Sequence, residues 1–157
     1  MTNKEIKIAY KEYEGPHQLE PQDRELAQAA IEAMAGSYAP YSQFNVGAAI
    51  RLDDGEIIKG ANQENAAYPS GLCAERTALF YAGASRPDKA VTSIAIAASQ
   101  HGNICESPVT PCGSCRQVMA QSQLRGGVPM KVILVGANKI WKFEQVDDLL
   151  PLIFDSI

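Results

Sequence analysis

The sequence has no long apolar run, and aromatic residues make up only 7% of it. Its longest apolar stretches, such as Ile94–Ala98 and Val132–Val135, are far shorter than the roughly 20 residues that a membrane-spanning helix needs. Residues 1–7 also lack the apolar segment and the small-residue cleavage site of a signal peptide. We therefore expect no membrane partner and a cytoplasmic location.

Basic residues are also scarce. The 14 Lys and Arg residues are outnumbered by 18 Asp and Glu residues, which gives a net charge of −4. Proteins that bind polynucleotides usually carry a basic face, and those that bind single strands interleave aromatic residues with it. Neither pattern is present in this sequence, so we expect a small-molecule substrate and no nucleic-acid partner.

The 157 residues are enough for one domain with a substantial core. Apolar periodicity of about 3.6 residues predicts helices, and short apolar runs predict strands. The predicted helices are Arg24–Met34, Leu72–Ala82, Cys112–Leu124 and a short terminal Val146–Leu150, and the predicted strands are Val46–Leu52, Glu56–Lys59, Ser93–Ala98, Met130–Val135 and Ile140–Phe143. Continuous apolar strands between helices indicate an α/β sheet that is covered on both faces.

The first residues and the connections follow different patterns. Glu5–Tyr13 alternates apolar with polar residues, which predicts an edge strand added to the sheet. Asp53–Gly55 is a typical hairpin turn. Asn62–Gly71 and Gln100–Pro111 have the composition of loops.

The chain has four cysteines: Cys73, Cys105, Cys112 and Cys115. In a reducing compartment such a set indicates metal binding or catalysis rather than disulfides. Cys73 begins one predicted helix, while Cys112 and Cys115 begin another. Helix N-termini favour the thiolate form, which is the form that binds zinc. Three ligands leave one tetrahedral position open, as in catalytic zinc sites.

Glu75 follows the first of these ligands by two residues. In the first turn of a helix both side chains can reach the same metal, so Glu75 can take a proton from a zinc-activated water and pass it on. Three thiolates and one Zn²⁺ sum to a charge of −1, which makes that water harder to ionise. Arg76 and Arg116 flank the ligands, and we expect them to offset this charge by hydrogen bonding to sulfur.

Two other interpretations of the cysteines compete with this one. Cys112 and Cys115 match the spacing of a redox pair, but that interpretation ignores Cys73 and Glu75. All four cysteines could also form a closed structural zinc site, because Cys105 lies in the loop before Cys112. A closed site would leave Glu75 without a role.

The sequence matches the deaminase signature, in which His or Cys, any residue and Glu precede Pro-Cys-x-x-Cys. On these residues and further motifs the chain resembles the cytidine deaminase family, of the small homotetrameric type with three cysteine ligands. The resemblance extends from about Leu26 to Phe154. It rests on five motifs: Phe44–Ala48, Asn62–Ala66, Tyr68-Pro69, Leu72–Ala78 and Pro111–Gln117.

The resemblance implies a fold, an assembly and a reaction. The fold is a three-layer α/β/α sandwich with a five-stranded mixed sheet. Residues 1–20 would then be an N-terminal extension, and residues 21–157 a single catalytic domain. The assembly is a homotetramer whose subunits share their sites. The reaction is the zinc-dependent hydrolysis of cytidine and 2′-deoxycytidine to uridine and 2′-deoxyuridine, a step of pyrimidine salvage.

The resemblance also assigns residues to the nucleoside. They are Phe44, Asn62, Glu64, Ala66, Tyr68, Ala74 and Phe154. Asn62 and Glu64 resemble the pair that binds the ribose 3′-hydroxyl. Ala66, Tyr68 and Phe154 resemble residues that reach the site of a neighbouring subunit.

Other interpretations of these residues stay open. Phe44, implied to pack on the pyrimidine ring, also suits a core position, and Asn62 also suits a turn. The negative charge of Glu64 favours nucleosides over nucleotides. Deamination of a related aminopyrimidine nucleoside, editing of a polynucleotide, and a non-catalytic zinc module are the alternative functions.

Overall fold

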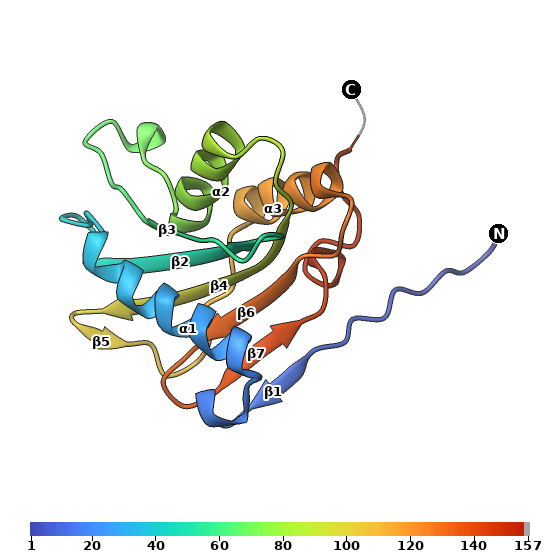
Figure 1. Cartoon of the computed structure of the whole chain (residues 1–157), viewed down its shortest axis with the longest axis horizontal. Coiled ribbons are helices and arrows are strands. Elements are labelled where there is room, and N and C mark those ends of the chain that lie inside the picture. The colour runs from blue at the N-terminus through green and yellow to red at the C-terminus, as the bar shows by residue number, and fades with distance from the viewer. Residues whose placement is uncertain (156–157) are drawn as a thin grey trace.

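The computed structural model describes residues 1–155, and in it a mixed sheet lies between two layers of helices (Figure 1). Helix α1 (Pro21–Ala33) covers one face of the sheet, while α2 (Ala74–Ser85) and α3 (Gly113–Gly126) lie together on the other. The predicted three-layer α/β/α architecture is therefore confirmed. Within residues 1–155, no helix combines the length and the hydropathy needed to cross a bilayer.

Within residues 1–155 the sheet has seven strands. They are β1 (Lys11–Tyr13), β2 (Phe44–Leu52), β3 (Ile57–Ala61), β4 (Val91–Gln100), β5 (Asn103–Ile104), β6 (Lys131–Val135) and β7 (Ile140–Phe143). The strand order is β1-β7-β6-β4-β2-β3, and β5 pairs with the end of β4. Because β3 and β4 both run antiparallel to β2, they run parallel to each other. The chain therefore leaves both strands at the same edge of the sheet, where α2 and α3 begin.

Side chains of β2 alternate between two apolar clusters. Ile50 packs with the residues beneath α2 and α3, whereas Ala49 packs with those beneath α1. The α1 face of the sheet carries small residues, and α1 approaches it closely. A Cβ atom on Gly47 would lie only 2.1 Å from the carbonyl oxygen of Ala30 in α1. The glycine is therefore required for this approach.

A buried ion pair joins α1 to the edge of the sheet. Asp23 Oδ2 lies 2.6 Å from Lys142 Nζ, and both side chains are less than 10% exposed. Burial lowers the pKa of Lys142, but its hydrogen bond and its attraction to Asp23 outweigh burial, so the pKa lies above its ordinary value. The pair fixes α1 relative to β7.

The structure corrects three predictions. The sheet has seven strands rather than five, because β1 extends one edge and β5 adds a short pair within the predicted loop Gln100–Pro111. Of the predicted strand Glu5–Tyr13, only Lys11–Tyr13 pairs, since β7 offers a partner only to this part. The predicted terminal helix is a 3-10 turn over Val146–Asp148. Further 3-10 turns lie at Pro16–Gln18, Met34–Gly36 and Tyr68–Ser70.

Candidate active site

Three cysteine thiols meet where α2 and α3 begin. Cys73 and Cys112 immediately precede the two helices, and Cys115 lies in the first turn of α3. Their Sγ atoms all lie within 4.8 Å of one another. Sulfur atoms around a tetrahedral zinc ion, at Zn–S distances of about 2.3 Å, are roughly 3.8 Å apart. This donor set fits Zn²⁺, and Cys105 is not part of it.

A glycine on β3 sets the position of the first helix. A Cβ atom on Gly60 would lie 2.6 Å from both the carbonyl oxygen of Ala74 and the backbone nitrogen of Ala78. The first turn of α2 therefore rests directly on the backbone of β3. This contact places Cys73 and Glu75 opposite the start of α3.

The two arginines beside the ligands have different partners. Arg76 Nη2 donates to Cys73 Sγ across 3.6 Å. Arg116 instead donates from Nε to the carbonyl oxygen of Pro111 (2.8 Å) and from Nη1 to that of Leu149 (2.9 Å). The expected contact with sulfur is thus present for Arg76, whereas Arg116 bonds to the loop before α3 and, through Leu149, to the C-terminal segment.

The thiols differ in acidity. A hydrogen bond from Cys115, together with the cationic Arg76, lowers the pKa of Cys73 to about 5 despite its partial burial. The pKa of Cys115 is raised, because its proton is held by Cys73 and because the side chain is buried. Without metal one thiol of this pair ionises first, and binding of Zn²⁺ displaces the remaining protons.

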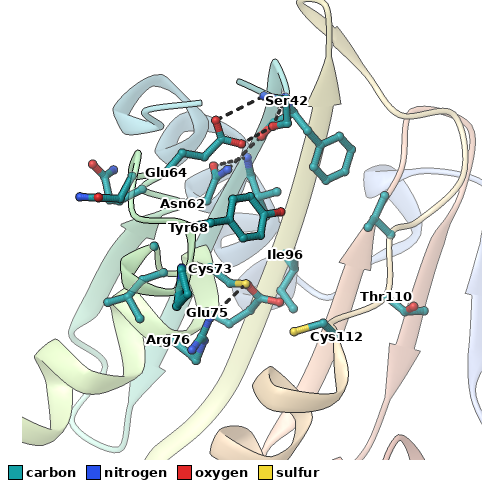
Figure 2. A pocket seen from close by; sticks show the side chains of 18 residues that line it. Ser42, Asn62, Glu64, Tyr68, Cys73, Glu75, Arg76, Ile96, Thr110 and Cys112 are labelled. Atoms are coloured by element: carbon teal, nitrogen blue, oxygen red, sulfur yellow. Dashed lines mark hydrogen bonds between the residues drawn. The ribbon is translucent and has the colours of Figure 1, made fainter. Parts of the chain in front are cut away.

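Glu75 places a carboxyl group beside these sulfurs. Its side chain is only 4% exposed, yet it lines a pocket (Figure 2). Burial raises the pKa of Glu75, and the negative charge of Cys73 raises it further. A buried carboxyl group with a raised pKa is suited to accept and return a proton near neutral pH.

The pocket has a volume of about 520 Å³, which is within the usual range for small-molecule sites. Several predicted site residues line it: Phe44, Asn62, Glu64, Tyr68, Cys73, Glu75, Arg76 and Cys112. Apolar walls come from Val46, Ile96 and Val109. The arrangement places an acid–base group and a metal-ligand cluster at one end of an apolar cavity.

The opposite end of the pocket is polar and centres on Glu64 (Figure 2). Glu64 accepts hydrogen bonds from the hydroxyl of Ser42 and from the backbone N–H groups of Tyr41 (2.8 Å) and Ser42 (3.3 Å). The Ser42 hydroxyl and these N–H groups hold the pKa of Glu64 below its ordinary value. A fixed, ionised carboxylate therefore lies at this end.

Asn62 lies near Glu64 and forms hydrogen bonds with three neighbouring residues. Its Oδ1 accepts from the Ser37 hydroxyl (2.5 Å) and the Val46 N–H (2.8 Å), and its Nδ2 donates to the Phe44 carbonyl oxygen (2.9 Å). Both lone pairs of the amide oxygen are thus occupied, and one N–H of the amide group is left for a ligand. Asn62 therefore also holds the local chain in place, as the alternative interpretation of this residue expects.

Three further predicted residues, Ala66, Ala74 and Phe154, lie outside the pocket lining, and Tyr68 lies at its exposed rim. Ala74 is fully buried beside β3, so only its backbone can contact a ligand. Ala66 is exposed, Tyr68 is 82% exposed at the rim, and Phe154 is 67% exposed. The backbone of Phe154 is hydrogen-bonded to Gln117 on α3, but its side chain is not part of the pocket lining.

Sequence reasoning missed Ser42 and Thr110, two polar residues of the pocket. Ser42 lies two residues before Phe44, in the loop around Pro40. Its place next to a predicted substrate contact was the available signal. Thr110 precedes the Pro111–Gln117 motif and carries no comparable signal.

Residues 20–130 match the family model described as the cytidine and deoxycytidylate deaminase zinc-binding region. A cytidine deaminase from Halalkalibacterium halodurans is 51% identical over 96 residues, which cover 61% of this chain and 68% of the relative. One from Mycobacterium tuberculosis is 42% identical over 96 residues, or 59% of this chain and 65% of the relative.

Solved structures show the same likeness over a greater length. The crystal structure of cytidine deaminase from Burkholderia pseudomallei superimposes with a TM-score of 0.69 at 39% identity, covering 83% of this chain and 97% of that one. The Mycobacterium tuberculosis enzyme gives a TM-score of 0.65 at 34% identity, covering 84% and 96%. With its thiol cluster and the fold that positions it, this chain belongs to the cytidine and deoxycytidylate deaminase zinc-binding family.

Proposed function

We propose that this protein hydrolyses cytidine and 2′-deoxycytidine to uridine and 2′-deoxyuridine, releasing ammonia in a step of pyrimidine salvage. The observation that carries the proposal is the meeting of three thiol ligands and the buried Glu75 at one end of a small-molecule pocket. The relatives bearing the name cytidine deaminase support the choice of substrate.

Cys73, Cys112 and Cys115 would hold the metal, with Arg76 balancing charge at Cys73. When bound there, Zn²⁺ supplies an acidified water as the nucleophile. Glu75 accepts a proton from that nucleophile and delivers it to the pyrimidine N3. A second proton passes through Glu75 to the leaving amine. The C4–N bond breaks, a C4–O bond forms, and ammonia leaves.

The remainder of the pocket would orient the nucleoside. Phe44 supplies an aromatic face for the pyrimidine ring. Glu64 accepts a hydrogen bond from the sugar 3′-hydroxyl, and Asn62 donates to it with its remaining N–H. A phosphate on the sugar would be repelled by the ionised Glu64, so nucleosides are preferred over nucleotides.

We further propose a homotetramer in which neighbouring subunits complete each site. The exposed Tyr68 and Phe154 support this, because large apolar side chains at a pocket rim and on a chain end become buried when a second subunit covers them. Residues 21–157 would form the single catalytic domain of each subunit. The cytoplasm, which keeps the four free cysteines reduced, is the proposed location.

A substrate panel tests this function. Zinc-loaded protein is given cytidine, 2′-deoxycytidine, cytidine 5′-monophosphate and a single-stranded cytosine oligonucleotide, and ammonia and the uracil product are measured. We expect turnover of the two nucleosides alone, and none with Cys112→Ser protein. Turnover of the oligonucleotide instead would favour polynucleotide editing. No turnover, despite one zinc bound per chain, would favour a different aminated substrate or a non-catalytic module.

A further inference from the structure

Residues 1–10, which we call the N-terminal arm, extend away from the body of the molecule (Figure 1). Only the three residues that follow the arm pair with β7, with Lys11 opposite Lys142 and Tyr13 opposite Ile140. Continued in the same register, Tyr10 lies opposite Phe143, the last residue of β7. The rest of the arm therefore runs past the end of its neighbouring strand.

The arm has one apolar face. Ile6 and Ile8 are each 56% exposed, and Tyr10 is 51% exposed. Alternation along an extended chain places these three side chains on one face. The same face continues onto the body of the molecule. The centroid of the Tyr10 ring lies 5.4 Å from the ring centroid of Trp141 and 5.2 Å from that of Phe143. An extended segment with an apolar face and free backbone groups is a template for pairing with another chain.

We propose that the arms of two copies of this chain pair with each other as antiparallel strands, with Ile8 of one copy opposite Ile8 of the other. β1 is the end strand of the sheet, so its outer edge is available for this contact. Pairing of the arms would join the edges of the two sheets.

The sequence of the arm is complementary to itself in this register. The opposed residues are Lys4 and Glu12, Glu5 and Lys11, Ile6 and Tyr10, and Ile8 with its own copy. Opposite charges and apolar side chains that face each other directly both stabilise an antiparallel pair. In this register, therefore, opposite charges and apolar side chains are both matched along the arm.

Neighbouring registers lack this complementarity. If one arm slides along the other so that each residue meets the next one along, Lys7 comes to lie opposite Ile8 or Tyr10. A charged side chain then lies against the apolar face. A shift by two places Lys7 opposite either Lys7 or Lys11 of the other copy, so that like charges meet. Charge complementarity thus selects a second copy as the occupant and the register centred on Ile8.

Existing contacts of β1 are compatible with this pairing. Within its own chain Lys11 Nζ contacts Glu144 (3.1 Å), and Glu12 Oε2 accepts from Trp141 Nε1 (2.6 Å) and contacts Lys139 (3.6 Å). These partners come from β7 and its flanks, on the inner side of β1. Glu5 and Lys4 of the other copy would approach from the outer side and extend the charge network.

The proposed contact is separate from the catalytic pocket. The match to the family model begins at residue 20, and the pocket lining begins at Ser42. Loss of the arm contact would therefore leave nucleoside turnover intact. Loss of turnover in the substrate panel would in turn say nothing against the arm contact.

Disulfide trapping in the full-length, zinc-loaded protein tests the register. Directly opposed residues of antiparallel strands have Cα atoms about 4.5–5.5 Å apart, within the range of a disulfide. Ile8→Cys should therefore give a covalent dimer under mild oxidation. Ile6→Cys is the matched control, because its two introduced thiols would lie about 13 Å apart along the strands. The wild-type protein controls for the four native thiols.

We expect at least a tenfold excess of covalent dimer for Ile8→Cys over Ile6→Cys, and dimer for the double variant Ile6→Cys/Tyr10→Cys. Equal yields for Ile8→Cys and Ile6→Cys, or no dimer from either, would overturn the proposal.

Discussion

The two ends of the pocket are held in different ways. The end that carries the metal ligands, which we call the floor, consists of Cys73, Glu75, Cys112 and Cys115, and the opposite end, the rim, consists of Ser42, Glu64 and Tyr68. The floor is fixed by two helix starts that pack on the sheet, and Glu75 is almost fully buried there. The rim depends on hydrogen bonds between loops, and Tyr68 is 82% exposed.

This difference separates chemistry from substrate selection. Every group that our mechanism needs for proton transfer and metal binding lies within one chain. Of the groups proposed to recognise and cover the nucleoside, Phe44, Asn62 and Glu64 are partly buried, whereas Tyr68 and Phe154 are exposed and would need a neighbouring subunit. Changes in the floor should therefore affect kcat, whereas changes in the rim should affect mainly KM.

The largest effect is expected from removal of a metal ligand. Cys112→Ser should lose bound zinc, and with it nearly all cytidine turnover, because a serine hydroxyl is a poor ligand at neutral pH. Zinc content and turnover are measured together. The matched control is Cys105→Ser, which should retain both, since Cys105 lies outside the thiol cluster. Zinc loss from Cys105→Ser would instead indicate a closed, structural site.

A change far from the pocket should alter stability and spare the chemistry. Asp23→Asn leaves Lys142 buried without its counter-ion, and we expect the free energy of unfolding to fall by about 3–5 kcal/mol. Denaturant titration measures this loss, while kcat of the folded protein should be unchanged. A double variant, Asp23→Leu with Lys142→Met, should recover much of the stability, because it removes both charges.

The same ion pair predicts a pH dependence. The pKa of Lys142 is raised in the folded state, so its contribution to stability is complete below the unfolded pKa of about 10.4. The contribution is then lost as the pH rises through the higher folded pKa. Wild type and the double variant should accordingly differ in the slope of stability against pH in this alkaline range. Parallel slopes would contradict the pKa shift.

Gly60→Ala should disturb the floor without touching any ligand. The added Cβ atom would lie 2.6 Å from the backbone of α2, so the helix must shift and carry Cys73 and Glu75 with it. A displacement of about 1 Å is expected to lower kcat by about 10²-fold. Kinetics on the zinc-loaded, folded variant measure the effect. Gly55→Ala is a useful control, because a Cβ atom there meets no neighbour, although its φ of +91° adds local strain.

The smallest effect is expected at the rim. Ser42→Ala removes the hydroxyl that donates to Glu64, and we expect KM for cytidine to rise about 3- to 10-fold with little change in kcat. Ser42→Thr, which keeps the hydroxyl, should behave like wild type. For 3′-deoxycytidine the alanine variant should show no further rise in KM, because this substrate lacks the hydroxyl that Glu64 would bind. A fall in kcat alone would place Ser42 in the floor's chemistry instead.

Local sequence patterns predicted the elements that depend on local propensities. The helix predicted over Leu72–Ala82 and the hairpin at Asp53–Gly55 follow from helix and turn propensities, and both are confirmed, although α2 begins two residues later, at Ala74. The strand predicted from Glu5 was too long, because pairing depends on where β7 ends, and no local pattern contains that information. A two-residue strand such as β5 is too short to produce a periodic signal.

The same distinction holds for the site. The two predicted helix starts and the match to the deaminase signature brought Cys73 together with the Cys112–Cys115 pair, and in the structure their sulfur atoms lie close enough to hold one metal ion. Whether Arg116 contacts sulfur or backbone depends on tertiary packing against Leu149, which spacing does not encode. The role of Ser42 likewise arises from a loop that folds against Glu64, 22 residues away in the chain.

The most direct test of the account is the turnover of cytidine by zinc-loaded Glu75→Gln protein beside wild type. Glutamine keeps the size and polarity of the side chain but cannot carry the proton. We predict one zinc per chain in both proteins, an unchanged fold, and a kcat that falls by about 10²- to 10⁴-fold in the variant. Full turnover by the zinc-loaded variant would contradict the assignment of Glu75 and, with it, the mechanism proposed for this pocket.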